Sequence, residues 1–480
     1  MGNPEANILV PIALFSWVPF VIFLYKKLDL RIVPVIAYVV GWMFLPCAEY
    51  DIFMLHNTKS AVIGYGLLVG ALLFDRERLT SYSFNKIDLP MILWCSTPFF
   101  SSVANGLGVY DGLSSVLYTT IRWGVPYYFG RVYFTDTDIL KTLALTIFIG
   151  GVTYVPFSLY ELKMSPQLHR LTYGFHQHDF LQTLREDGGY RPMVYMDHGL
   201  MAAMWMMLAT LMGTWLYITK ALPKKILFVP SSVLLGILVI TFLMYQSMAA
   251  VSYFMLGTFM LYLGMKSRSI SLVIVLLIVP YLYIFSRTTG YWDGTNLSNF
   301  IAKNISPARA QSLQFRFDNE TILIDKALQG SFFGWGGYGR ARVKSEEDDE
   351  KDITVTDGLW VIVLGNNGIY GLAWLTLAAQ LPAMLFINKI DSEEWGSPHY
   401  AAPAAMAIFI GFTMVDNLLN AMVNPIYLVI SGGLLGMCIK EPESFTTPVD
   451  EHEPDLFKEI NRQMSRFLSD PGNSKSRFIR

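Results

Sequence analysis

Long uncharged, apolar stretches recur along this chain of 480 residues, and they limit what it can fold into. A helix needs about 20 such residues to cross the roughly 30 Å hydrocarbon core of a bilayer. The pattern therefore predicts an all-α polytopic membrane protein with about thirteen transmembrane helices, in a range of roughly 12–14. The spans are expected near residues 8–25, 32–48, 60–74, 89–104, 113–130, 139–160, 199–219, 226–244, 248–265, 270–286, 358–388, 400–415 and 425–439.

Composition agrees with this class of protein. Hydrophobic residues make up 53% of the chain and charged residues 15%, against about 25% charged in a soluble domain. A net charge of -2 gives no global basic field, so no nucleic-acid partner is expected. Cys47, Cys95 and Cys438 lie in apolar runs, which argues against a disulfide framework or a thiolate metal site. The first eight residues lack Lys and Arg, so the first span is expected to be retained and not cleaved as a signal peptide.

The charges of the short loops predict the topology. The segments "YKKLDLR", "DRERLTSYSFNK", "KALPKK" and "KSRS" are rich in Lys and Arg, and such loops face the cytoplasm. This places the N-terminus outside, the C-terminus inside, and two long loops with short helices, 161–198 and 287–357, on the outer face. Residues 1–439 form the membrane domain. Residues 440–480 form a cytoplasmic tail, whose amphipathic helix is expected to rest on the inner leaflet or a partner.

The second long loop carries signals for a helix. Ser306 is a candidate N-cap followed by Pro307 at the first helical position, and Gly330 closes the segment. We expect this helix to lie along the outer membrane surface through a broad apolar stripe. The stripe comprises Leu313, Phe317, Ile324 and Leu328.

The predicted span 358–388 is too long for one straight crossing. It is interrupted by "GNNG", so we expect a break there. The true crossing would then be 369–388, with 358–365 as an apolar helical lead-in.

The first long loop ends in "RPMVYMDHG", which supplies candidate site residues. Pro192 is expected to begin a helix, with Arg191 just before it and His198 about one and a half turns into it. Arg191 and His198 are seven residues apart, so both would lie near the same stripe of the helix surface. A functional interpretation makes Arg191 a phosphate ligand and His198 a base. The alternative is that Arg191 reaches lipid phosphates and His198 is a polar residue at a helix end.

The second loop supplies a matching set. Arg316 and Arg340 offer planar guanidinium forks suited to a diphosphate. Asp357 is the last charge before an apolar run, where it would accept a proton from a hydroxyl or merely cap a helix. Arg122 is the clearest charge inside a predicted span, so it is either a further substrate ligand or an interfacial residue.

No metal is expected. The segment "HQHD" at 176–179 has ligand-type side chains but no helical i, i+4 pairing. The acidic run 346–352 lacks the glycine and alternating oxygens of a calcium loop, so a solvated charged face is favoured.

The second loop resembles the bacterial O-antigen polymerase and O-antigen ligase superfamily of membrane glycosyltransferases. The resemblance rests on "RFDNETILIDKALQGSFFGWGGYGR" followed by "TDGLWVIVLGNNGIYGLAW". In that family an arginine-bearing outer helix leads to a glycine turn, a His-Asn or Asp-Asn at re-entry and a Gly-x-x-Gly element. Arg316, the turn 334–339, Asp357, and Gly368 with Gly371 stand at those positions here. Ligases typically carry His at re-entry, and this chain has Asp357 followed by Gly358 instead.

The resemblance implies a metal-independent, inverting enzyme without a cofactor. Its donor would be a glycan on polyprenyl diphosphate and its acceptor a sugar hydroxyl. The enzyme would act at the periplasmic face of the bacterial inner membrane, with a chain-length regulator or other envelope-assembly proteins as candidate partners. Departure from the ligase pattern favours a polymerase of O-antigen or exopolysaccharide repeat units.

Two alternatives stay open. One is an O-antigen ligase that moves glycan to a lipid A core sugar. The other is a secondary transporter or lipid flippase, which would place ionisable groups near the bilayer midplane.

Overall fold

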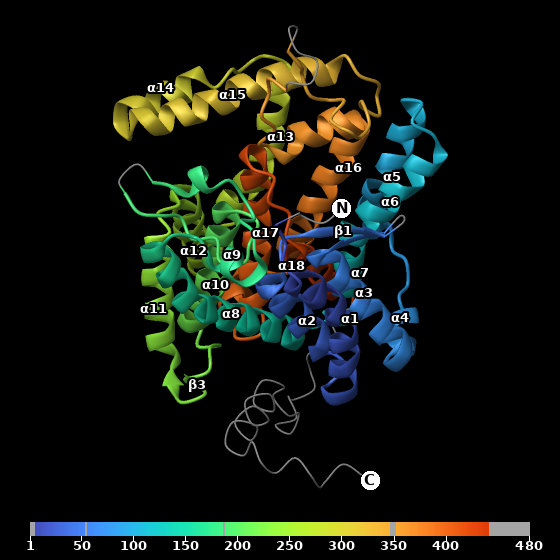
Figure 1. Ribbon diagram of the computed structural model, residues 1–480. Coiled ribbons are helices and arrows are strands. Elements are labelled where there is room, and N and C mark those ends of the chain that lie inside the picture. Colours follow the sequence, from blue (N-terminus) through green and yellow to red (C-terminus); the bar gives the residue numbers. More distant parts are fainter. Residues whose placement is uncertain (1–4, 53–54, 186–187, 346–351, 441–480) are drawn as a thin grey trace.

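The computed structural model describes residues 5–52, 55–185, 188–345 and 352–440. The predicted tail helix and most of the acidic run 346–352 lie outside these ranges. Within them the chain is mostly helical, and its helices form one bundle crossed at one end by α14 and α15 (Figure 1).

Eight of the described helices are long and apolar enough to cross a membrane. They are α1 (Leu9–Lys27), α5 (Leu89–Ala104, with the 3-10 turn Lys86–Asp88), α8 (Thr137–Met164), α10 (Gly199–Ile218), α12 (Met248–Ser267), α13 (Ser271–Thr288), α16 (Leu359–Lys389) and α17 (Ala401–Leu419). Four more are apolar but shorter: α2 (Ile32–Phe44), α3 (Lys59–Phe74), α11 (Ser231–Met244) and α18 (Pro425–Ile439). The class of fold is therefore as predicted, while the count of about thirteen spans stays a prediction.

The remaining elements connect these helices. They are β1 (Glu49–Ile52), β2 (Leu55–Thr58), α4 (Arg76–Thr80), α6 (Val109–Thr119), a π-helical turn (Thr120–Gly124), α7 (Val125–Tyr133), α9 (Leu168–Tyr173), a 3-10 turn (Phe180–Thr183), β3 (Lys225–Ile226), β4 (Val229–Pro230), α14 (Thr295–Asn304), α15 (Pro307–Leu328) and a 3-10 turn (Ser392–Gly396). Each strand pair is a small antiparallel hairpin. The basic segments that contain α4 and β3 lie at the end of the bundle opposite α14 and α15 (Figure 1).

Helices α10 and α17 form the centre of the bundle. Their apolar windows are 89% and 78% buried, whereas those of α1, α12 and α13 are each 28% buried. The outer helices accordingly expose large apolar side chains such as Met255 and Leu282. A helix that is apolar all round but exposed on one side suits a lipid environment.

Two glycine pairs four residues apart, Gly66 with Gly70 and Gly432 with Gly436, allow close helix packing. A Cβ on Gly70 of α3 would lie 2.3 Å from the ring of Tyr25 on α1, and one on Gly432 of α18 would lie 2.1 Å from the Tyr127 carbonyl on α7. These contacts leave no space for a ligand at either pair.

Helix α16 is broken where expected. Gly368 has φ 66° and ψ -167°, which interrupts the helix within "GNNG". The glycine turn of the second loop fills the break: Trp335 N–H donates to the Gly365 carbonyl at 2.8 Å and Gly336 N–H to that of Asn366 at 3.0 Å. The backbone of this turn thus packs directly against the backbone of α16.

Substitution within this turn gives a matched test. Gly334 has φ 79°, and a Cβ there would lie 2.4 Å from the Gly368 nitrogen, whereas a Cβ on Gly337 would meet nothing within 4 Å. We expect Gly334→Ala to lower the free energy of unfolding by about 1–3 kcal/mol. Gly337→Ala should leave it nearly unchanged in detergent-based thermal unfolding. Equal midpoints for the two variants would contradict this packing.

Two expectations about α15 have different outcomes. The helix begins at Pro307 with Ser306 as its cap, as predicted. Its predicted apolar stripe is divided between two environments: Phe317 and Ile324 are buried, whereas Leu328 is 50% exposed. Ile324 packs in a cluster with residues of α16, so the buried part of the stripe holds α15 to the bundle.

Candidate functional site

An arginine-lined cavity lies between the two long loops. Its volume is about 450 Å³, and its walls come from the end of the first loop and from α10, α12, α14 and α15. Four arginines line it, Arg185, Arg191, Arg309 and Arg316, and no described lining residue is acidic. The structure therefore brings together two of the predicted diphosphate ligands, Arg191 and Arg316, and adds two more cations.

Arg191 is a largely buried cation with an unsatisfied donor. Its aliphatic stem packs against Gly199, where a Cβ would lie 2.5 Å from it. Among the described residues, none accepts a hydrogen bond from its buried Nε. Burial, followed by repulsion from Arg316 and Arg309, lowers the pKa of Arg191. A buried cation with an unsatisfied donor destabilises the folded protein unless a bound anion compensates its charge.

Arg185 is also a cation of this cavity whose described hydrogen-bond partners are uncharged. Its guanidinium donates to the backbone carbonyls of Tyr245 and Tyr190, the latter at 3.3 Å. Burial, with repulsion from Arg191 and Arg309, lowers its pKa to about 10. Neutral carbonyls do not balance the charge, so this end of the cavity favours a polyanion.

Arg316 links the cavity to the predicted base. Its Nε lies 3.4 Å from Oδ2 of Asp357, and Nη1 donates to the Leu419 carbonyl at 3.3 Å. Asp357 precedes the Gly358 N-cap of α16, whose N-terminus makes no side-chain cap hydrogen bond. Asp357 is thus held beside a cavity arginine and does not act as the helix cap.

His198 lies in a different local structure from the one predicted. Residues 192–198 are not helical, and α10 begins only at Gly199. The prediction that Pro192 starts the helix was wrong because buried Glu161 of α8 accepts the backbone N–H groups of Met193 and Val194 at 2.8 and 2.7 Å. This bond pattern holds the chain in a turn, so Arg191 and His198 share no helical stripe.

His198 itself caps α10. Its Nδ1 accepts the Leu200 N–H at 3.0 Å, so its proton is assigned to Nε2. Burial, then repulsion from His178, Arg191 and Arg316, lowers its pKa to about 4. A neutral imidazole whose acceptor nitrogen is already used is a poor general base, which favours Asp357 for that role.

A second cavity, of about 410 Å³, is lined by His198. Arg122 lines it from the π-helical turn and donates to the Tyr118 hydroxyl at 2.9 Å. Lys59, buried at the start of α3, lies 3.6 Å from Asp197. This cavity mixes both charge signs. Arg122 lines it and does not line the arginine-lined cavity, so the structure does not bring Arg122 together with Arg191 and Arg316.

Arg340 is not brought into either cavity. It is exposed in the glycine turn and donates to the Asn105 carbonyl at 3.3 Å. Its assignment to the diphosphate therefore loses geometric support, because the turn packs into the break in α16. Arg185 and Arg309 were missed in the sequence, where the available signal is weak: Arg185 lies six residues before Arg191, and Arg309 seven before Arg316.

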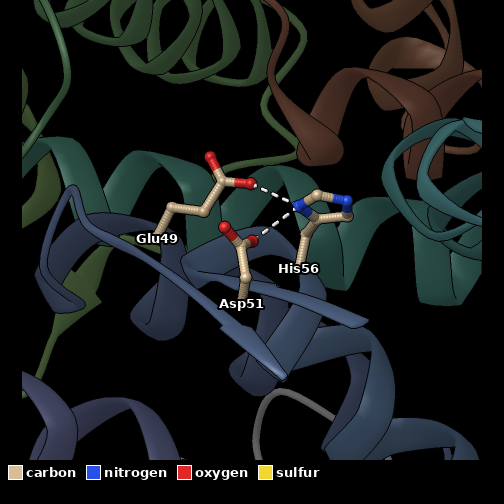
Figure 2. Close-up of side chains that lie close together, drawn as sticks. All are labelled: Glu49, Asp51 and His56. Carbon is tan, nitrogen blue, oxygen red and sulfur yellow. Dashed lines mark hydrogen bonds and ion pairs between the residues drawn. The ribbon is translucent and has the colours of Figure 1, made fainter. Parts of the chain in front are cut away.

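The histidines of "HQHD" form no metal-ligand cluster among the described residues. The ring of His178 packs edge-on against that of His198, with centroids 4.5 Å apart. The one group of three ligand-type side chains found in the described chain is Glu49, Asp51 and His56 on the β1–β2 hairpin (Figure 2).

The first loop should be sensitive to acid. Burial lowers the pKa of both His169 and His198 to about 4, against about 6.5 in an unfolded chain. Between these two pKa values the unfolded state binds more protons than the folded state. The contribution of these histidines to the free energy of unfolding is therefore fully present above about pH 6.5 and is lost as the pH falls towards 4. His198→Asn keeps a capping acceptor and removes one titration. We expect a smaller drop in its thermal midpoint over this range than in the wild type; identical pH profiles would contradict the assignment.

The fold and its cavities define a polytopic helical membrane protein with a cationic cavity between two loops. No known family model matches the chain, and no curated protein matches it.

Proposed function

We propose that this protein is a membrane glycosyltransferase that transfers glycan from a polyprenyl-diphosphate carrier to a sugar hydroxyl. The observation that carries the proposal is the cavity lined by four arginines with no described acid. A diphosphate leaving group gains charge as its bond to the sugar breaks, and preorganised guanidinium groups stabilise that charge. Arg191 lines this cavity, so its guanidinium charge is available to such an anion.

The proposed reaction needs one base. The acceptor oxygen attacks the anomeric carbon, the bond from that carbon to the diphosphate oxygen breaks, and the acceptor proton passes to Asp357. Inversion follows from a single displacement. Asp357 suits this role because it lies 3.4 Å from Arg316, so the base and the leaving-group clamp are neighbours.

The setting suits a lipid-linked donor. The cavity lies among α10, α12, α14 and α15, and α12 exposes much of its apolar surface. A polyprenyl chain in the bilayer would bring the diphosphate to membrane level. We propose that this end of the bundle faces the periplasm of a bacterial inner membrane, opposite the basic loops.

Reconstitution tests the activity. The purified protein is placed in proteoliposomes with a polyprenyl-diphosphate oligosaccharide, and products are resolved by mass. Growth of product length indicates a polymerase, our leading assignment. Transfer only to an added lipid A core acceptor indicates a ligase. Release of no polyprenyl diphosphate with either acceptor would refute glycosyl transfer.

A flippase or transporter is the second candidate. Its support is that Arg122 lines a cavity and that α16 is broken at Gly368, since transporters use broken helices beside polar sites. The same proteoliposomes discriminate: movement of chemically unchanged donor across the bilayer would favour transport over transfer.

A further inference from the structure

Three ligand-type side chains converge on the β1–β2 hairpin. Asp51 pairs directly with His56 in the antiparallel register, and Glu49 lies two residues from Asp51, so all three side chains share one face. Nδ1 of His56 lies 2.9 Å from a Glu49 oxygen and 2.7 Å from an Asp51 oxygen. Both carboxylates are aimed at the same ring nitrogen (Figure 2).

A metal cation bound between the two carboxylates and Nδ1 of His56 would compensate their negative charge. Two carboxylates that approach the same ring nitrogen repel each other, and Nδ1 carries at most one proton to share between them. The ligand atoms all lie within 4.8 Å of one another. Adjacent ligands of an octahedral ion bound at about 2.1 Å are separated by roughly 3 Å, which is close to the spacing found here.

The surroundings leave the group accessible from one side. The side chains of Glu49 and Asp51 are each 46% exposed, and that of His56 is 32% exposed. The His56 ring packs edge-on against Tyr118, with centroids 5.0 Å apart. Tyr118 and Glu49 both line the second cavity, so the group lies at its edge, on the same cavity as Arg122.

We propose that His56 Nδ1 and the carboxylates of Glu49 and Asp51 bind one divalent transition-metal ion, Mn²⁺ or Zn²⁺. A mixed nitrogen and carboxylate set suits these ions. Three protein ligands leave further positions for water or for an oxygen of a ligand in the second cavity. This inference departs from the metal-free expectation and is independent of glycosyl transfer.

Direct metal binding tests the site. Full-length protein, freed of its affinity tag and stripped with EDTA, is dialysed against Zn²⁺ or Mn²⁺, and bound metal is counted by elemental mass spectrometry. We expect about one ion per chain, with affinity lowered at least tenfold in both His56→Gln and Glu49→Gln. A matched control carries His399→Gln with Asp318→Asn, away from the hairpin, and should bind as the wild type does.

Other outcomes would overturn the inference. They are no stoichiometric uptake by the wild type, or equal uptake by the wild type and by both hairpin variants. Thermal midpoints measured without metal check that each variant folds. Mn²⁺ electron paramagnetic resonance provides a second readout: the bound-ion spectrum should be present in the control and absent in Glu49→Gln. Because both readouts measure metal and not product, they can fail while the transferase proposal stands.

Discussion

Arg191→Ala is expected to reduce glycan transfer by about 10²–10³-fold, the typical cost of removing one preorganised donor to transition-state charge. Its largely buried guanidinium has a donor without a described acceptor and faces Arg309 and Arg316. Arg191→Lys retains a charge but loses the planar fork, so an intermediate rate is expected.

The stability of the same variant distinguishes a functional arginine from a structural one. Removing a buried cation that is repelled by its neighbours relieves an unfavourable interaction, so the ligand-free protein should unfold at the same temperature or higher. Activity would then fall while stability holds or rises. Arg340→Ala is the matched control, because Arg340 is exposed and lies outside the cavity. Arg191→Ala membranes that make product at the wild-type rate would contradict the assignment.

Glu320→Ala is expected to cost about 3–5 kcal/mol of folding free energy, because it breaks a buried ion pair and leaves one charge uncompensated. Oε2 of Glu320 accepts from Arg287 Nε at 3.1 Å and from the Tyr283 hydroxyl at 2.7 Å, and Oε1 accepts from Trp360 Nε1 at 3.0 Å. This cluster ties α13, α15 and α16 together one turn from Arg316.

A double-mutant cycle makes the Glu320 prediction sharper. Arg287→Met combined with Glu320→Ala should lose less stability than the two single changes summed, because no unpaired charge remains. Asp318→Asn, on an exposed position of the same helix, should change stability little. Unfolding is followed by denaturant titration in detergent. Additive losses, or a Glu320→Ala cost similar to that of Asp318→Asn, would contradict the role given to the buried pair.

Local rules predicted some parts of the fold well. The apolar runs correspond to described helices, and the Ser306–Pro307 start of α15 follows from capping and proline geometry. The break in α16 follows from its length and the glycine at 368. These features depend on residues within a few positions of one another, so a sequence pattern contains them.

Other parts depend on distant residues. The turn at 193–194 is held by Glu161, more than thirty positions earlier, which no local signal near Pro192 reveals. The hairpin pairing that joins Glu49, Asp51 and His56 depends on strand register. Arg340 looked equivalent to Arg316 in sequence, and only the packing of the glycine turn into α16 separates them.

The most direct test of the central claim is the affinity of the arginine-lined cavity for a prenyl diphosphate. Isothermal titration of detergent-purified wild type with a short prenyl diphosphate is compared with Arg191→Ala, Arg316→Ala and Arg340→Ala. We expect the affinity to fall at least tenfold in the first two variants, to stay at the wild-type value in the third, and to weaken with salt in the wild type. Equal affinity in all four proteins would show that the diphosphate does not bind at Arg191 and Arg316.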